Sequence, residues 1–248
     1  MTTSKLNSIN TRAPKDIDKE KTKAKTDQML LELDDLQNLL YAENKHSLLV
    51  ILQGMDASGK DGAIRSVFGK LNPQGVSVES FKVPTQEELS HDFLWRIHSH
   101  APAKGKIQVF NRSQYEDIVV TRVHNLCDDE IAKKRMDAIN NFEKLLTDHN
   151  STHVLKFYLH ISPEEQQERL RERLLEPKKM WKYNKRDLLE AESWDKYMKM
   201  YEDCFTHCNH VPWHIIPSDQ NWYKEYLITL KVYDTLKELK MKYPGLRQ

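Results

Sequence analysis

A glycine-rich segment with the G-x-x-x-x-G-K spacing of a phosphate-binding loop occupies residues 54–60, GMDASGK. It follows an apolar run and precedes an expected helix, which is the context that separates such a loop from a chance match. Glycines let successive backbone N–H groups converge on phosphate oxygens, and a lysine adds a mobile positive charge. The alternative is an ordinary strand-to-helix turn of small residues. The residues expected to bind phosphate here are Gly54, Ala57, Ser58, Gly59, Lys60, Asp61 and Gly62.

Two carboxylates distinguish this loop from that of an ordinary nucleoside triphosphatase. Asp61 follows Lys60 where such an enzyme has Ser or Thr, and Asp56 lies inside the loop itself. Bare carboxylates beside bound phosphate repel it unless a divalent cation lies between them. The sequence therefore predicts Mg²⁺ held by acidic side chains.

A second charged group follows the apolar run at residues 106–110 and has the sequence NRSQYED. If that run is a parallel strand, its carboxyl end lies beside the phosphate loop. Arg112 can then clamp phosphate oxygens with two parallel hydrogen bonds. Asp117, or as second choice Glu116, can complete the metal site. Alternatively, these charges cap the following helix and pair with Arg122.

A basic stretch runs from Arg169 to Arg186. Arg169 and Arg173 are one helical turn apart, and Lys178 and Lys179 follow. In a phosphate-loop enzyme, this position after the fourth strand corresponds to a mobile lid whose arginines neutralise phosphate charge. The alternatives are a solvated helix face and a nucleic-acid groove that uses nearby aromatic rings.

The chain of 248 residues is nearly neutral, because 38 basic residues face 37 acidic ones. A polyanionic partner must therefore meet a local basic cluster, and a nucleic-acid partner is not expected. No apolar stretch approaches the length of a membrane span, and the three cysteines form no disulfide framework, so we expect a cytoplasmic protein. Cys204 and Cys208 are spaced as zinc ligands are, but no second ligand pair follows, so we expect ordinary helix packing there.

Apolar runs alternate with helical patterns along the chain, which predicts an α/β three-layer sandwich around a parallel five-stranded sheet. Residues 1–25 are interpreted as a flexible polar arm and residues 26–248 as a single domain with a lid at about 163–190. The predicted strands are 47–53, 76–83, 106–110, 153–161 and 213–216. The predicted helices are 26–43, 60–71, 86–100, one from about 115, 129–148, 163–176 and 222–243.

Several linked motifs together resemble a family-2 polyphosphate kinase. These motifs are GMDASGKDG, FKVPT, HDFLWRIH, FNRSQYEDIVVTRVH and WDKYMKMYE. The likeness extends from about Leu48 to Tyr226 and is far more specific than the loop alone. It implies a P-loop kinase domain with a thymidylate-kinase-like fold and a helical lid. Family members that make ATP from ADP carry an Asp-Arg-Ser-Trp-Tyr-Asn pattern where this chain has FNRSQYED, so the chain is more similar to the class III group, which accepts both AMP and ADP.

The resemblance also implies Mg²⁺, reversible transfer between inorganic polyphosphate and AMP, ADP or ATP, and a homo-oligomer, either a dimer or a tetramer. Carried onto this sequence, it makes Asp56 and Asp117 the metal ligands and Lys60 and Arg112 the cations at the transfer site. The further residues assigned to binding phosphate or nucleotide are Arg122, Arg169, Arg173, Lys178 and Lys179.

Two other functions fit part of the sequence. An ATP-dependent nucleoside monophosphate kinase would use the same loop, but it has no need for an extended cationic track such as Arg169 to Arg186. A non-catalytic module that binds polyphosphate or nucleotide would keep the loop without the chemistry. We expect in-line attack by a nucleotide phosphate oxygen on the terminal phosphorus of polyphosphate, which requires no general base.

Overall fold

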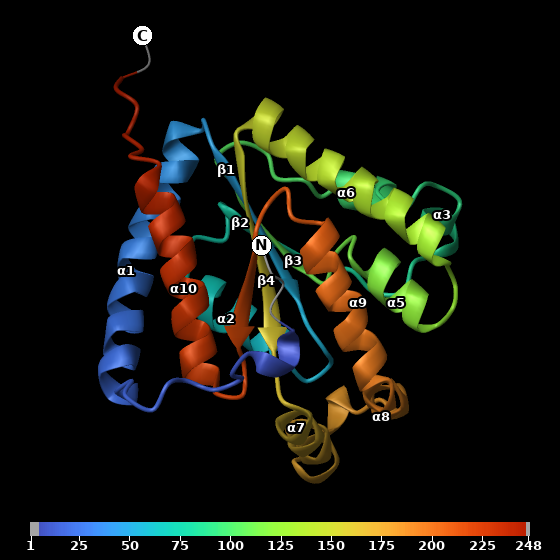
Figure 1. The fold of residues 1–248 in the computed structure, drawn as a ribbon. Coiled ribbons are helices and arrows are strands. Elements are labelled where there is room, and N and C mark those ends of the chain that lie inside the picture. Colours follow the sequence, from blue (N-terminus) through green and yellow to red (C-terminus); the bar gives the residue numbers. More distant parts are fainter. Residues whose placement is uncertain (1–4, 247–248) are drawn as a thin grey trace.

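The computed structural model describes residues 5–246, which form a five-stranded sheet in the order β2-β3-β1-β4-β5 (Figure 1). Every pairing in this sheet is parallel, and each strand lies at or near its predicted position. The strands are β1 (Ser47–Gln53), β2 (Val76–Ser80), β3 (Ile107–Asn111), β4 (Thr152–His160) and β5 (Trp213–Pro217). β1 is buried along its whole length, as a central strand covered on both faces requires.

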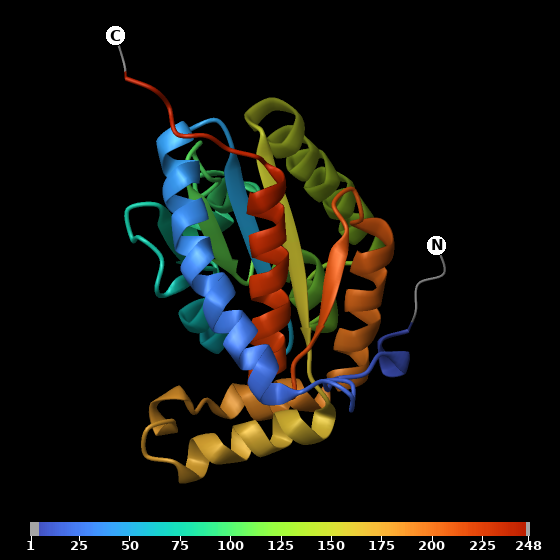
Figure 2. The same cartoon turned by 90° about the vertical axis from the view of Figure 1, so that its left-hand side faces the viewer.

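Helices cover both faces of the sheet, with α1, α2 and α10 on one side and α5, α6 and α9 on the other (Figures 1 and 2). The α-helices are α1 (Lys19–Glu43), α2 (Lys60–Phe68), α3 (Gln86–Leu89), α4 (Trp95–His98), α5 (Glu116–Val123), α6 (Asp129–Asn150), α7 (Pro163–Leu175), α8 (Lys185–Glu192), α9 (Trp194–His207) and α10 (Asn221–Glu238). Two short 3₁₀ helices are η1 (Leu6–Ser8) and η2 (Met180–Lys182). None of the helices described here has the length and apolarity to span a lipid bilayer.

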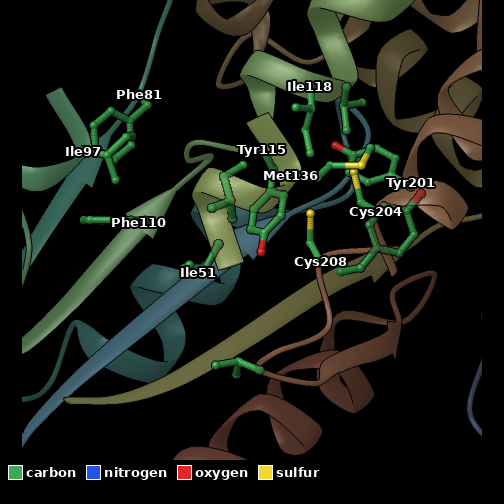
Figure 3. Packing of buried hydrophobic residues seen from close by; sticks show 14 of the residues in the cluster. Ile51, Phe81, Ile97, Phe110, Tyr115, Ile118, Met136, Tyr201, Cys204 and Cys208 are labelled. Carbon is green, nitrogen blue, oxygen red and sulfur yellow. The ribbon is translucent and has the colours of Figure 1, made fainter. Parts of the chain in front are cut away.

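Each face of the sheet carries its own hydrophobic core. The core under α5, α6 and α9 contains Ile51, Phe110, Tyr115 and Tyr201 (Figure 3). Cys204 and Cys208 lie in the same core with free thiols, which is the helix packing expected of them. The opposite core joins β1 and β4 to α1, α2 and α10. The three-layer α/β prediction is thereby confirmed.

The predicted helices at 86–100 and 222–243 differ from the structure. The single helix predicted at 86–100 is two short helices, α3 and α4, because the Asp92 carboxylate accepts a hydrogen bond from the Leu94 N–H at 2.9 Å and stabilises a local turn between them. The last helix ends at Glu238 and not near Tyr243, and Lys240 has a left-handed φ of 50°. Helices α8 and α9 were not assigned from the sequence.

The N-terminal segment differs most from expectation. Helix α1 begins at Lys19, where the Asp18 side chain caps it, and not near Thr26. The Leu6 side chain is fully buried in the core, and the Leu6 N–H donates to the Glu202 carboxylate at 2.7 Å. Leu6, Thr11 and Ala13 thus contact the domain, residues 14–18 are exposed, and the flexibility of the expected arm stays a prediction. Residues 1–4 of that expected arm lie outside the described residues.

Candidate active site

The carboxyl ends of four strands meet at one edge of the sheet and place the candidate residues together. β1 ends at Gln53 directly before the phosphate loop, and Asn111 at the end of β3 is in register with Leu52 of β1. His160 of β4 is in register with Pro217 of β5. In parallel α/β sheets, ligands bind at this edge.

Backbone conformation explains why the loop needs its glycines. Gly54 and Gly59 have φ angles of 149° and 93°, which disfavour any other residue. A Cβ atom at Gly54 would lie 2.8 Å from the Leu159 carbonyl oxygen, and one at Gly59 would lie 2.1 Å from Lys224 Nζ. Ala57 also has a positive φ of 63°. The loop is therefore a tightly wound turn, and the helix that follows it, α2, starts at Lys60.

Lys60 lies inside this turn. Its ammonium donates to the Gly54 and Met55 carbonyl oxygens at 2.7 and 3.1 Å, and the residue is 8% exposed. Burial, and secondarily the nearby Arg112 guanidinium, lowers the pKa of Lys60 to about 8. A phosphate anion beside the loop would favour the charged form and oppose that shift.

A cavity of about 750 Å³ opens between the loop, the segment after β2 and the basic stretch of α7 and η2. Eight Lys or Arg residues and three Asp or Glu residues line it, which gives a formal net charge of +5. The basic residues are Lys60, Lys82, Arg112, Arg169, Arg173, Lys179, Lys182 and Lys224. This cavity concentrates positive charge on a chain whose net charge is only +1, so it is suited to a polyanion.

Arg112 joins the two acidic residues nearest to the loop. Its guanidinium donates to Asp56 at 2.6 Å and to Glu116 at 3.3 Å. The Glu116 carboxylate, together with Asp56, raises the pKa of Arg112 above its usual value. Burial opposes this rise without cancelling it. Burial raises the pKa of Glu116. The three residues also line a second, small cleft of about 30 Å³ beside Tyr197 and Tyr201.

Asp117 and Arg122 lie elsewhere in the structure. The Asp117 carboxylate pairs with Arg96 at 3.4 Å, and neither it nor Arg122 lines the cavity. Arg122 pairs with Asp129 and Asp203, both at 2.7 Å. The arrangement thus places Glu116, the second choice from the sequence, beside Asp56 through a shared arginine. Arg122 joins α5 to α6 and α9 through its two ion pairs, and it does not line the cavity.

The basic residues of the lid reach the cavity in different ways. Arg173 and Lys179 line it, and they pair with Asp187 and Glu172 respectively. Lys178 does not line it. Arg169 lines it, but its guanidinium donates to the carbonyl oxygens of Ala57, Ser218 and Asp219 at 2.8–3.0 Å. Arg169 therefore holds the loop through a backbone carbonyl oxygen.

Sequence reasoning missed Lys224 on α10. Its side chain is fully buried, and its ammonium donates to the Gly59 carbonyl oxygen at 3.2 Å and to Asn221 Oδ1 at 2.9 Å. Burial, and then the positive charge of Arg169, lowers the pKa of Lys224 to about 8. No motif surrounds Lys224 in the sequence; the one available signal is a lysine placed on the apolar face of the last helix.

The carboxylates at the cavity suit a magnesium ion that arrives with phosphate. Asp56 and Asp61 line the cavity, and their side chains are 22% and 65% exposed. Within residues 5–246, no group of three or more His, Cys, Asp or Glu side chains is placed to hold a metal ion. Mg²⁺ is commonly bound by one or two carboxylates together with substrate phosphates, so this donor set fits it.

Known proteins share both the sequence pattern and the fold. The family model for polyphosphate kinase 2 matches residues 16–244. The chain belongs to the polyphosphate kinase 2 family. The crystal structure of polyphosphate kinase 2 from Arthrobacter aurescens TC1 matches with a TM-score of 0.96 and 38% sequence identity, over 100% of this chain and 90% of that one. The fold is therefore that of a P-loop kinase, as the resemblance of the motifs implied.

Two relatives of this polyphosphate kinase 2 chain carry more specific names. An AMP/ADP-polyphosphate phosphotransferase of Meiothermus ruber is 49% identical over 214 residues, which cover 86% of this chain and 80% of the relative. An ADP-polyphosphate phosphotransferase of Rhodopseudomonas palustris is 43% identical over 226 residues, which cover 86% of this chain and 78% of the relative. Both relatives thus match along most of their length.

Proposed function

We propose that this protein transfers a phosphoryl group from inorganic polyphosphate to AMP and to ADP, reversibly. The observation that carries the proposal is the cavity of net charge +5 beside the phosphate loop, in a chain that belongs to the polyphosphate kinase 2 family. A compact triphosphate needs few cations, whereas a long polyanion needs a continued row of them. The names of the two relatives support AMP and ADP as acceptors.

The residues at the cavity divide the work of transfer. Backbone N–H groups of the loop and the start of α2 hold phosphate oxygens, and Lys60 lies inside that turn to neutralise charge on the transferring group. Arg112 is already oriented by Asp56 and Glu116, so little side-chain freedom is lost when phosphate binds. The attacking nucleotide oxygen is ionised, so no residue needs to remove a proton.

Asp56 is the residue that we assign to magnesium, with Asp61 beside it in the cavity. When bound with phosphate, the ion supplies charge neutralisation at the transferring group. Replacing Asp56 by asparagine is expected to lower kcat about 10–100-fold, in the range typical of altered metal sites, and to raise the Mg²⁺ concentration that gives half-maximal rate. Steady-state rates over a magnesium titration measure both quantities.

Asp35→Asn is the matched control for this substitution, because Asp35 is an exposed residue of α1. It should leave the rate and the magnesium curve unchanged. Wild-type turnover with an unaltered magnesium curve in Asp56→Asn would show that Asp56 has no role in holding the ion. Because Asp56 also pairs with Arg112, circular dichroism must first show that the variant is folded.

Parallel donor assays test the proposed function directly. AMP is offered with polyphosphate in one reaction and with ATP in another, and ADP, GMP and GDP are then offered with polyphosphate. We expect ADP and ATP to form from AMP only when polyphosphate is present. Faster transfer from ATP would instead indicate a nucleoside monophosphate kinase. Tight binding of polyphosphate without any product would indicate a non-catalytic binding protein.

The cellular setting and the assembly are part of the same proposal. Three buried free thiols, at Cys127, Cys204 and Cys208, suit a reducing cytoplasm. A dimer or tetramer is expected from the resemblance of the motifs. Light scattering on a size-exclusion column, at several protein concentrations, distinguishes these assemblies from a monomer.

A further inference from the structure

The N-terminal strap, defined here as residues 5–18, contacts the domain between Leu6 and Ala13, and its last five residues are exposed. Its first anchor is the buried Leu6 side chain, whose N–H donates to Glu202. Further along, the Ala13 N–H donates to Gln220 Oε1 at 2.9 Å. Figure 2 shows the strap passing between the lid helices and the carboxyl edge of the sheet. It therefore crosses the molecule next to the candidate active site.

Asp219, in the turn between β5 and α10, is where the strap meets the lid. Its side chain is 3% exposed. One carboxylate oxygen accepts from Thr11 Oγ1 at 2.7 Å and from Ser162 Oγ at 3.0 Å, and the other accepts from the Ser162 N–H at 2.8 Å. The Asp219 N–H donates to the Thr11 carbonyl oxygen at 3.0 Å. Three donors from two distant segments thus share one buried carboxylate.

Ser162 transmits this contact to the lid helix. Its hydroxyl caps α7 by accepting from the Glu165 N–H at 3.2 Å, while its proton is directed to Asp219. Asp219 therefore fixes the hydroxyl that caps α7, and its negative charge lies at the positive end of that helix. Arg12, the nearest cation, is 3.9 Å away and 59% exposed, so the helix terminus and the hydrogen bonds carry most of the stabilisation.

Helix α7 in turn holds the phosphate loop. Gln166, one turn into the helix, donates to the Asp56 carbonyl oxygen at 3.0 Å. Arg169, on the next turn, donates to the Ala57 carbonyl oxygen and also to the Asp219 carbonyl oxygen, both at 3.0 Å. An unbroken series of hydrogen bonds therefore runs from the strap through Asp219 and Ser162 into α7 and ends at the loop.

We propose that Asp219 is a positioning residue, which couples the N-terminal strap to the lid helix and, through that helix, to the phosphate loop. It touches no substrate itself. When Thr11 is bound, the carboxylate holds Ser162 in the capping position, so α7 keeps Gln166 and Arg169 on the loop carbonyls. Loss of the strap contact frees the start of α7 and loosens the loop before phosphate binds. The consequence for substrate rests on the proposed function.

Two variants test the coupling. Thr11→Val removes one hydroxyl from the strap and keeps the shape of the side chain, and Ser8→Ala is its matched control, because the Ser8 hydroxyl donates only to Lys5 within the strap. For Thr11→Val we expect amides at the start of α7 to exchange with solvent about fivefold faster, since one hydrogen bond is worth about that factor. We also expect about a fivefold higher KM for polyphosphate. Asp219→Asn should give larger changes of both kinds, because one of the two accepting oxygens becomes an NH₂, which cannot accept from the two hydroxyls or from the Ser162 N–H.

Each result decides the matter. Faster exchange in α7 together with a raised KM, with Ser8→Ala like the parent, supports the proposal. A lower melting temperature with unchanged α7 exchange and unchanged KM would show that the strap is only a structural fastening, and the proposal would be wrong. Hydrogen exchange and calorimetric binding of tripolyphosphate need no turnover. A parent chain that shows no polyphosphate-dependent transfer would therefore contradict the proposed function, while these two measurements still judge the coupling.

Discussion

Replacing Lys60 by methionine is expected to lower the rate of phosphoryl transfer from polyphosphate by on the order of 10²–10³-fold, the usual effect of removing one group that stabilises charge in a transition state. Methionine has a similar length and suits a site that is 8% exposed, so the helix α2 should still form. Steady-state kinetics with AMP and polyphosphate measure the change. The matched control is Lys70→Met, an exposed lysine just past α2, which should leave the rate unchanged.

The lowered pKa of Lys60 gives this substitution a second signature. In the protein without ligand, Lys60 has a pKa of about 8 and loses its proton as the pH rises through 8. Bound phosphate keeps Lys60 protonated. Binding then takes up a proton at Lys60, which should lower the affinity for tripolyphosphate by up to about tenfold per pH unit above 8, in addition to any uptake at Lys224. Part of this slope should vanish in Lys60→Met, and Lys224 should supply the remainder. An identical slope in the variant and the parent would exclude Lys60 as the titrating group.

The core of this site could be predicted from sequence because it is local in the chain. The loop from Gly54 to Lys60 follows a strand and opens a helix, and its glycines have the positive φ angles that such a turn requires. The strands could also be predicted from the sequence, since buried parallel strands are continuous apolar runs between polar segments. One helix, at 86–100, was misjudged because Asp92 competes for a backbone N–H within the apolar pattern.

What could not be predicted depends on orientation or on long-range contact. Glu116 and Asp117 are adjacent at the start of α5, so their side chains point about 100° apart, and the sequence does not say which faces Arg112. The structure places Glu116 there and pairs Asp117 with Arg96. Lys224 lines the cavity and Asp219 holds the start of α7, and both come from the far end of the chain, where no motif marks them. Only folding brings these two residues to their positions.

A buried ion pair below the site is a further feature that sequence showed only as a lysine within an apolar run. Lys156, in the middle of β4, donates to Glu143 and to the Tyr115 hydroxyl, both at 2.8 Å, and the Tyr115 hydroxyl donates to Glu143 at 2.6 Å. The Lys156 and Glu143 side chains are 0% exposed. Burial lowers the pKa of Lys156 and raises that of Glu143, and the contact between them opposes both shifts. The network holds the side chain of Tyr115, the residue that directly precedes Glu116 of the candidate site.

Breaking this pair on one side is expected to destabilise the fold strongly. Lys156→Met leaves the Glu143 carboxylate buried without its cation, so the free energy of unfolding should fall by about 3–5 kcal/mol. Urea unfolding followed by circular dichroism at one fixed protein concentration measures it. The control Lys144→Met breaks the exposed Lys144–Asp148 pair on α6, the helix that also carries Glu143. This control should leave the unfolding midpoint near that of the parent.

A triple variant separates the burial of charge from the packing of the network. Combining Lys156→Met with Glu143→Leu and Tyr115→Phe removes every buried polar group that Lys156→Met alone would leave without a partner. The Cys208 carbonyl oxygen keeps its hydrogen bond from Trp213 Nε1 at 3.0 Å. Since apolar residues of similar volume often replace a buried pair without loss, most of the lost stability should return. If the triple variant is as unstable as Lys156→Met, the cost comes from altered packing and not from the unpaired carboxylate.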